Sequence, residues 1–187
     1  IQKSLAVVAK MYFNNPTDKL NMIGITGTKG KSTTAYYVKS ILDSYMREVD
    51  GTDTAILSSI NNYDGKTNVE SVLTTQESYE IEKYARNAVD SNLKNLVMEV
   101  SSQALKKDRV YGITYDEAVF LNISEDHISN IEHPDFDDYF ESKLKIFKQA
   151  KVACVNLNMD NIENLLKVLD YAKNADKIIT FGTTRNA

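Results

Sequence analysis

Short apolar runs alternate along the chain with stretches that repeat apolar residues every three or four positions. The apolar runs lie at residues 22–26, 96–100, 118–123, 152–156 and 178–181. The stretches with helical spacing lie at residues 33–45, 77–91, 136–148 and 161–173. Strands buried on both faces read as continuous apolar runs, and amphipathic helices show a helical period, so this alternation predicts an α/β fold. We expect a mainly parallel sheet flanked by helices.

Two further segments lie outside this alternation. Residues 1–13 have helical spacing and end before Asn14, Asn15 and Pro16, so we expect a leading helix. Residues 50–68 are rich in Asn, Asp, Gly and Thr, and we expect an edge hairpin or a loop that leaves the sheet. The chain has 187 residues, of which 42% are hydrophobic, so it can bury one core. We therefore expect a single domain over residues 1–187.

Composition excludes several classes of protein. A net charge of -4 leaves no dominant basic face, which argues against nucleic acid as a partner. The single cysteine, Cys154, cannot form an internal disulfide, and no stretch reaches the roughly 20 apolar residues that span a bilayer. We expect a soluble, cytoplasmic protein with no membrane partner. The chain starts at Ile1 without a charged and apolar leader, so we expect no secretory signal and a segment cut from a longer polypeptide.

The strongest chemical signal is MIGITGTKGKSTT, where the first apolar run meets the first helical stretch. A strand that leads through a glycine-rich loop into a helix gathers backbone amides and a helix N-terminus, where phosphate can bind. Lys31 would add a positive charge, and the Ser32 hydroxyl would bind a magnesium ion that bridges the phosphates. The usual pattern has a glycine where this chain has Ile25, so the loop is a shortened variant anchored on Gly27. The alternative is a structural turn between strand and helix.

Several motifs resemble the Mur ligases, the family that couples ATP hydrolysis to amide bond formation in making the bacterial cell-wall peptide. The loop at 26–34 is similar to the family's Gly-Thr-x-Gly-Lys-Thr, and MEVSSQAL at 98–105 is similar to its Glu-Val-Ser-Ser-His-Ala-Leu. AVFLNISEDH at 118–127 resembles its strand ending in Asp-His, and DYFESKLKIF at 138–147 resembles its lysine-bearing helix. With LTTQES at 73–78, the match extends over nearly the whole chain. The most similar branch is the UDP-N-acetylmuramoyl-tripeptide synthetases.

The resemblance implies a P-loop-containing central ATP-binding domain that binds ATP and Mg²⁺. The implied nucleotide contacts are Gly27, Thr28, Lys29, Gly30, Lys31, Ser32, Thr33 and Asn156. The implied magnesium ligands are Ser32, Glu99, His127 and Lys143, and the implied catalytic residues are Lys31, Glu99, His127 and Lys143. The implied contacts to the nucleotide-sugar peptide are Thr74, Thr75, Ser101 and Ser102, although hydroxyls of this kind also serve as helix caps and turn residues.

Two of these residues have alternative interpretations when they are considered without the family. Glu99 ends an apolar strand, where an unpaired carboxylate is costly to bury, so it needs either a magnesium ion or a nearby lysine. His127 follows another apolar run, and a lone histidine near two acids is otherwise a surface or capping residue. We assign no role to the other histidine, His133.

Lys143 lies within an apolar stripe of the helix predicted at 136–148. The other members of the stripe are Phe136, Phe140 and Phe147. One interpretation is a stem that carries its ammonium to water. The other is a desolvated amine with a depressed pKa, which can react with carbon dioxide to form a carbamate. The resemblance implies a carbamylated lysine here, which helps to hold a second magnesium ion.

The chain also departs from the family pattern. Gln76 stands where the branch has proline, and Gln103 stands where it has histidine. In an Asn-x-Asp-Asp motif expected near the adenine, Asn158 and Met159 replace the acids and only Asn156 matches. The family's amino-terminal substrate domain and carboxyl-terminal domain are not part of the resemblance, so we expect this fragment not to complete the reaction alone.

The resemblance implies a ligase domain that adds an amino acid to a UDP-N-acetylmuramoyl peptide through an acyl phosphate. One alternative is a Mur-like ligase for another acid, in folylpolyglutamate or polyamide synthesis, which the replacements at Gln76 and Gln103 leave open. A second is a nucleotide-binding module that hydrolyses nothing. The presence of Ser32, Glu99, His127 and Lys143 together argues against that module, because a binding loop alone does not require the last two.

Overall fold

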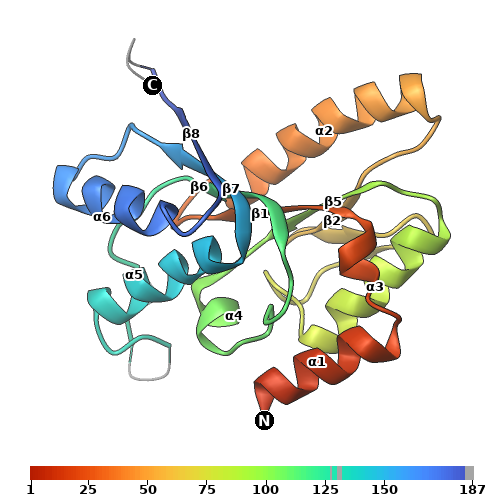
Figure 1. Ribbon diagram of the computed structural model, residues 1–187, viewed down its shortest axis with the longest axis horizontal. Helices are drawn as coiled ribbons and strands as arrows, with labels where there is room; N and C mark the ends of the chain where they lie inside the picture. The colour runs from red at the N-terminus through yellow and green to blue at the C-terminus, as the bar shows by residue number, and fades with distance from the viewer. Residues whose placement is uncertain (127, 130–131, 184–187) are drawn as a thin grey trace.

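The computed structural model describes residues 1–126, 128–129 and 132–183. Within these ranges an eight-stranded sheet carries helices on both faces (Figure 1). The strands are β1 (Asn21–Thr26), β2 (Ala55–Leu57), β3 (Asn61–Tyr63), β4 (Asn68–Glu70), β5 (Asn95–Glu99), β6 (Tyr115–Phe120), β7 (Ala150–Asn156) and β8 (Lys177–Phe181). The α-helices are α1 (Gln2–Tyr12), α2 (Lys31–Val49), α3 (Ser78–Asp90), α4 (Ser102–Lys106), α5 (Phe136–Leu144) and α6 (Ile162–Ala172). The 3₁₀ helices are η1 (Pro16–Lys19) and η2 (Lys145–Gln149).

The sheet has its topological centre at β1. The strand order is β4-β3-β2-β5-β1-β6-β7-β8. The six strands from β2 through β5, β1, β6 and β7 to β8 are all parallel to one another. β3 pairs antiparallel with β2, and β4 pairs antiparallel with β3. The chain after β1 builds one side of the sheet as far as β5 and then crosses to build the other side from β6 onward. Ligands of open α/β sheets bind outside the carboxyl ends of the strands at such a reversal of strand order.

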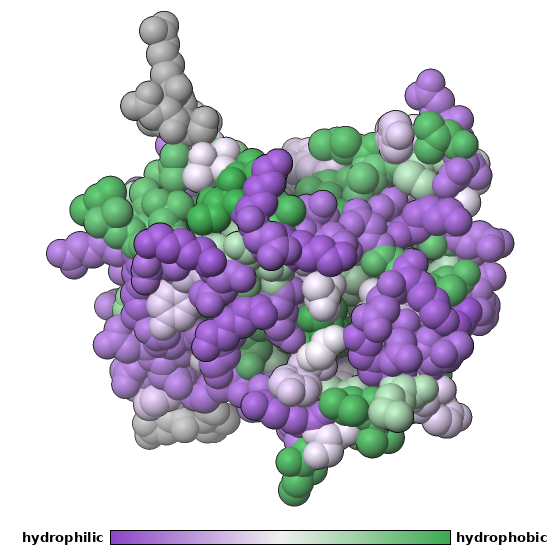
Figure 2. Space-filling model, in the orientation of Figure 1, coloured by the Kyte–Doolittle hydropathy of each residue, from purple (hydrophilic) through white to green (hydrophobic). Residues whose placement is uncertain are grey.

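Two apolar layers hold the helices on the sheet. In Figure 1, α2 lies on one side of the sheet, while α3, α4 and α5 lie on the other. Side chains alternate between the two faces of a strand. Along β1, Met22 therefore packs into the layer beside α3, α4 and α5, and Ile23 and Ile25 pack under α2. Figure 2 shows hydrophobic residues along the upper edge of the molecule, over α2 and near β8, above a mostly hydrophilic face. The layer that contains Met22 has more buried residues than the layer under α2 and forms the main core.

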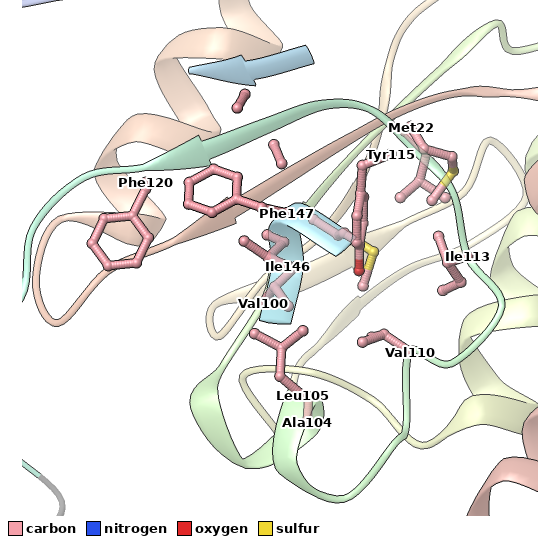
Figure 3. Close-up of a cluster of buried hydrophobic side chains, with 14 of the residues drawn as sticks. Met22, Val100, Ala104, Leu105, Val110, Ile113, Tyr115, Phe120, Ile146 and Phe147 are labelled. Carbon is pink, nitrogen blue, oxygen red and sulfur yellow. The ribbon is translucent and has the colours of Figure 1, made fainter. Parts of the chain in front are cut away.

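Tyr115 fixes the close approach of β6 to β1. Its side chain is fully buried and lies beside Met22 in the core cluster of Figure 3. A Cβ atom at Gly24 would lie 2.7 Å from Cδ1 of the Tyr115 ring. The ring therefore occupies the space that a side chain at Gly24 would need, and glycine is required there for packing.

The predicted α/β fold with a mainly parallel sheet is confirmed, but two predicted boundaries are wrong and one strand was not predicted. The strand predicted at 118–123 is β6, which ends at Phe120, because Leu121 and Ile123 bury apolar side chains from the loop that follows. The helix predicted at 136–148 changes to the 3₁₀ helix η2 after Leu144. The segment 50–68 contains an edge hairpin, as predicted, but also β2, which pairs inside the sheet with β5.

Candidate active site

The glycine loop connects β1 to the first turn of α2. Gly30 is the N-cap of α2 with φ 83°, and Gly27 has φ 154°. A Cβ atom at Gly27 would lie 3.0 Å from Cβ of Leu121, so the loop approaches the β6 loop closely. The N-cap residue of α2 makes no side-chain cap hydrogen bond. The first N–H groups of a helix have no partner within the helix, so this end of α2 presents donors and a positive dipole end to an anion.

Asn122, just after β6, holds the loop in place. Its Oδ1 accepts hydrogen bonds from the backbone N–H groups of Thr28 and Lys29, both at 3.0 Å. Its Nδ2 donates to the carbonyl oxygen of Lys29 at 3.0 Å. The amides of Thr28 and Lys29 are therefore engaged, which leaves the N–H groups at the start of α2 as the donors that this loop can offer to a ligand. Sequence reasoning missed this role, because nothing in the spacing of residues 27 and 122 shows that they meet.

Two lysine ammonium groups converge on one backbone oxygen of the loop. The carbonyl oxygen of Gly27 accepts from Nζ of Lys31 at 3.0 Å and from Nζ of Lys143 at 2.9 Å. Nζ of Lys31 also donates to the carbonyl oxygen of Thr28 at 3.2 Å. Burial lowers the pKa of Lys31, while the nearby carboxylates of Glu99 and Asp126 raise it. Lys31 and Lys143 thus bring two amines to the loop that precedes the N-terminus of α2.

Lys143 is buried on α5. It is 2% exposed, and its ammonium lies 4.7 Å from the centre of the Tyr139 ring. The Tyr139 hydroxyl donates to Oγ1 of Thr28 at 3.1 Å, so the helix and the loop are joined at this point. Burial is the largest cause that lowers the pKa of Lys143 to about 7, and the charge of Lys31 lowers it further. The stem therefore does not carry the ammonium to water.

Ser32 and Glu99 face each other across Ser59, which sequence reasoning missed. Oε1 of Glu99 accepts from the backbone N–H of Ser59 at 2.9 Å and from its hydroxyl at 3.1 Å. The hydroxyls of Ser59 and Ser32 lie 3.0 Å apart. Glu99 is 1% exposed, and all three side chains come from the carboxyl ends of neighbouring strands or from the helix start. The hydroxyl of Ser59 thus lies between two oxygen donors of the type that Mg²⁺ prefers.

The remaining predicted ligand, His127, lies outside the described residues. Among the described residues, no three His, Cys, Asp or Glu side chains gather as a metal site. The predicted ligand set contains only one such residue in those ranges, Glu99, together with a serine and a lysine. The oxygen atoms of Ser32 and Glu99 fit a hard cation, and Lys143 fits only after its amine is converted to an oxygen ligand.

A pocket of about 170 Å³ opens beside the two lysines. It is lined by the four predicted substrate residues Thr74, Thr75, Ser101 and Ser102, together with Lys31, Lys143, Leu73, Gln103, Arg109 and Glu132. The predicted nucleotide and substrate residues are therefore adjacent at one sheet edge. Arg109 was missed by sequence reasoning. It pairs with Glu77 at 2.9 Å and supplies a cation to the pocket wall.

Two of the lining hydroxyls also hold the backbone. The Thr75 hydroxyl donates to the carbonyl oxygen of Glu99 at 2.9 Å, and its oxygen accepts from the backbone N–H of Ser101 at 2.9 Å. The Ser101 side chain caps α4 by accepting from Ala104 N at 3.2 Å. Gln76, which replaces the expected proline, donates to the carbonyl oxygen of Leu73 at 2.9 Å. The polar pocket wall is thus built on a fixed backbone.

The other predicted nucleotide residues lie at the same edge. Thr33 is exposed in the first turn of α2. Asn156 ends β7, donates to the carbonyl oxygen of Leu121 at 2.9 Å and accepts from the backbone N–H of Asn158 at 3.0 Å. It therefore braces the β6 loop from the neighbouring strand. No helix in the described ranges has both the length and the hydrophobicity that a bilayer span requires.

The sequence is similar to known proteins over most of its length. Residues 25–187 match the family described as Mur ligase middle domain. The chain is 39% identical over 186 residues to the UDP-N-acetylmuramoyl-L-alanyl-D-glutamate--2,6-diaminopimelate ligase of Clostridium perfringens, covering 100% of this chain and 37% of that protein. It is 45% identical over 161 residues to the UDP-N-acetylmuramoyl-L-alanyl-D-glutamate--L-lysine ligase of Enterococcus faecalis, covering 86% and 31%. The chain thus spans about a third of the length of these relatives.

The fold is shared more widely than the sequence. A structure of Mycobacterium tuberculosis folylpolyglutamate synthase, complexed with ADP and AMPPCP, superposes with a TM-score of 0.71 at 16% identity. The match covers 98% of this chain and 49% of that one. At such low identity the likeness concerns the fold alone.

Proposed function

The chain belongs to the Mur ligase family, and from this premise we propose that it is the ATP-binding domain of a ligase that adds an amino acid to a UDP-N-acetylmuramoyl peptide in peptidoglycan synthesis. The observation that carries the proposal is the convergence of Lys31 and Lys143 on the carbonyl oxygen of Gly27. Lys31 supplies the positive charge at this point, which lies between a helix N-terminus and a pocket lined by hydroxyls. ATP phosphates and a peptide carboxylate can therefore meet there.

The reaction that fits this arrangement has two steps. An oxygen of the peptide carboxylate attacks the γ-phosphorus of ATP, the bond to the bridging oxygen breaks, and ADP leaves an acyl phosphate. An amine nitrogen then attacks the carbonyl carbon, the bond to the phosphate oxygen breaks, and the amine proton passes to solvent. Phosphoryl transfer depends on positioning and charge neutralisation, which Lys31 and the first amides of α2 supply.

Mg²⁺ would be held by Ser32, Glu99 and Lys143, with His127 as a further ligand. When bound, the ion neutralises the phosphate oxygens and orients them for in-line transfer. Ser59 supports this assignment, because its backbone N–H fixes the buried carboxylate of Glu99 toward Ser32. The Ser59 hydroxyl lies 3.0 Å from that of Ser32 and 3.1 Å from Oε1 of Glu99, so both hard ligands stand around one side chain.

Lys143 would act as a carbamate. Its neutral amine nitrogen bonds to the carbon of carbon dioxide and releases one proton to solvent, which converts the neutral amine into an anionic oxygen ligand. The pKa of about 7 supports this step, because about half of the amine is then neutral near neutral pH. The change would also remove the repulsion between Lys143 and Lys31.

The second candidate function is a Mur-like ligase for another acid, including a folylpolyglutamate. The observations that favour it are Gln76 and Gln103 in the pocket region. Against it, Thr74, Thr75, Ser101 and Ser102, the residues predicted to contact the muramoyl peptide, all line the pocket. A module that only binds nucleotide would not need Glu99 and Lys143 buried beside the loop.

The test uses the full-length protein, since the isolated domain is expected to be inactive. ATP-dependent phosphate release is measured with UDP-N-acetylmuramoyl-dipeptide, a panel of amino acids and a folate control. Release that requires the muramoyl peptide and one amino acid supports the proposal and names the amine. If the protein binds ATP but releases no phosphate when the muramoyl peptide is added, the proposal is contradicted. Phosphate release with the folate favours the second candidate. A cytoplasmic location follows if ATP and the nucleotide sugar are its substrates.

A further inference from the structure

His133 is fully buried between two polar side chains. It has 0% exposure, its Nδ1 lies 2.6 Å from Oδ2 of Asp138, and its Nε2 lies 2.9 Å from Oγ of Ser102. The edge of the Tyr139 ring packs against the imidazole, with ring centres 5.2 Å apart. The imidazole is thus held on three sides, and one of its partners, Ser102, lines the pocket beside the phosphate loop.

The hydrogen bonds determine which nitrogen carries the proton. An ionised carboxylate only accepts, and Nζ of Lys106 at 2.6 Å holds the pKa of the Asp138 carboxyl below its usual range, with His133 as a smaller cause. In the neutral imidazole, Nδ1 therefore donates to Asp138 and Nε2 is left as an acceptor. The hydroxyl of Ser102 then has to donate its single proton to Nε2. Its oxygen keeps lone pairs but has no proton for the pocket.

We propose that His133 is a positioning residue that makes Ser102 an acceptor-only contact for a backbone N–H group of the peptide part of the acceptor substrate. The proposal rests on the muramoyl-peptide function above. A free serine hydroxyl rotates and can donate or accept, whereas one whose proton is committed presents only an acceptor. Ser102 would then bind amide N–H groups and disfavour carboxylate or carbonyl oxygens at the same point.

The surroundings argue against a purely structural role. Nζ of Lys106 contacts both Asp138 and the carbonyl oxygen of Glu132, so α4, α5 and the segment before α5 are joined without the imidazole. Packing alone would be served by an apolar side chain, because a buried polar group costs free energy unless it is hydrogen-bonded. His133 instead places an acceptor nitrogen beside the hydroxyl of Ser102, a pocket residue of α4 that is 4% exposed.

The test is a double-mutant cycle in the full-length enzyme, assayed by phosphate release at saturating ATP and amino acid. Loss of one hydrogen bond corresponds to roughly a two- to tenfold change. Ser102→Ala should raise KM for UDP-N-acetylmuramoyl-dipeptide by that factor, with kcat within about twofold, as expected when uniform binding is lost. His133→Asn should do the same, because its amide can reach Asp138 but leaves the hydroxyl without its acceptor. Combining the two should add nothing further.

His133→Gln is the matched control, because its longer amide can place an oxygen near the position of Nε2. It should keep KM closer to the unaltered value than His133→Asn does, with KM for ATP unchanged in both. Additive effects in the double variant, or an unchanged KM in Ser102→Ala, would overturn the role of His133. Equal losses in Asn and Gln variants that also raise KM for ATP would indicate a structural residue. An unaltered enzyme that does not use the muramoyl dipeptide would instead refute the proposed function and this acceptor with it.

Discussion

Replacing Lys143 with methionine should stabilise the fold near neutral pH, although the proposed chemistry would be lost. The pKa of Lys143 falls from 10.5 to about 7 in the folded protein. Between these values the unfolded chain binds a proton that the folded chain has released, so folding is penalised at low pH and recovers as pH rises. At about 1.4 kcal/mol per pKa unit, the penalty is about 4 kcal/mol at pH 7 and about 2 kcal/mol at pH 9.

The assay is urea unfolding of the 187-residue chain at pH 7 and pH 9 in buffers free of carbon dioxide, which prevents the carbamate from forming. The stability gain from Lys143→Met should be roughly 2 kcal/mol smaller at pH 9 than at pH 7. The difference between the two pH values removes the packing contribution of the methionine. Lys145→Met is the matched control, since Lys145 is exposed two residues along the chain, and its effect should not change with pH. A gain from Lys143→Met that is equal at both pH values would refute the reasoning.

Three further changes test the packing and the loop. Gly24→Ala should cost about 1–3 kcal/mol in urea unfolding, because the new Cβ would lie 2.7 Å from the Tyr115 ring; no loss would contradict the close approach. Asn122→Ala should weaken ATP binding about tenfold by calorimetry on the full-length protein, because it removes the side-chain hydrogen bonds that hold the loop at Thr28 and Lys29 in place; an unchanged affinity would contradict this role. Ser59→Ala should raise the Mg²⁺ concentration needed for half-maximal activity while leaving urea stability within about 1 kcal/mol, and an unchanged requirement would argue against a role at the metal site.

The parts of the fold that sequence patterns predicted are those with a local cause. The central strands are buried on both faces and therefore appear as continuous apolar runs. β2 was missed because it has only three residues and lies in a polar segment, where its place beside β5 depends on pairing with a strand forty residues away. The end of α5 was missed because α-helical and 3₁₀ turns place residues three apart on nearly the same face, so the stripe at Phe140 and Phe147 continues across the boundary.

The residues of the candidate site also fall into those with a local sequence signal and those that depend on distant partners. The loop and Lys143 follow from motifs and helical spacing within one segment. Asn122, Ser59 and His133 act by reaching residues that are distant in sequence, so only the folded chain brings them to their partners. His133 was assigned no role, because nothing in its neighbouring residues indicates Ser102 as its partner.

In the proposed reaction, a peptide carboxylate takes the γ-phosphoryl group of ATP beside Lys31 and Lys143. The most direct measurement uses full-length enzyme, ATP and UDP-N-acetylmuramoyl-dipeptide with its acceptor carboxylate labelled with ¹⁸O, together with the amino acid that supports turnover. Mass spectrometry of the released phosphate should find one ¹⁸O atom per phosphate, because the acyl phosphate leaves with a carboxylate oxygen. Released phosphate without ¹⁸O, while the amide product still forms, would contradict the account.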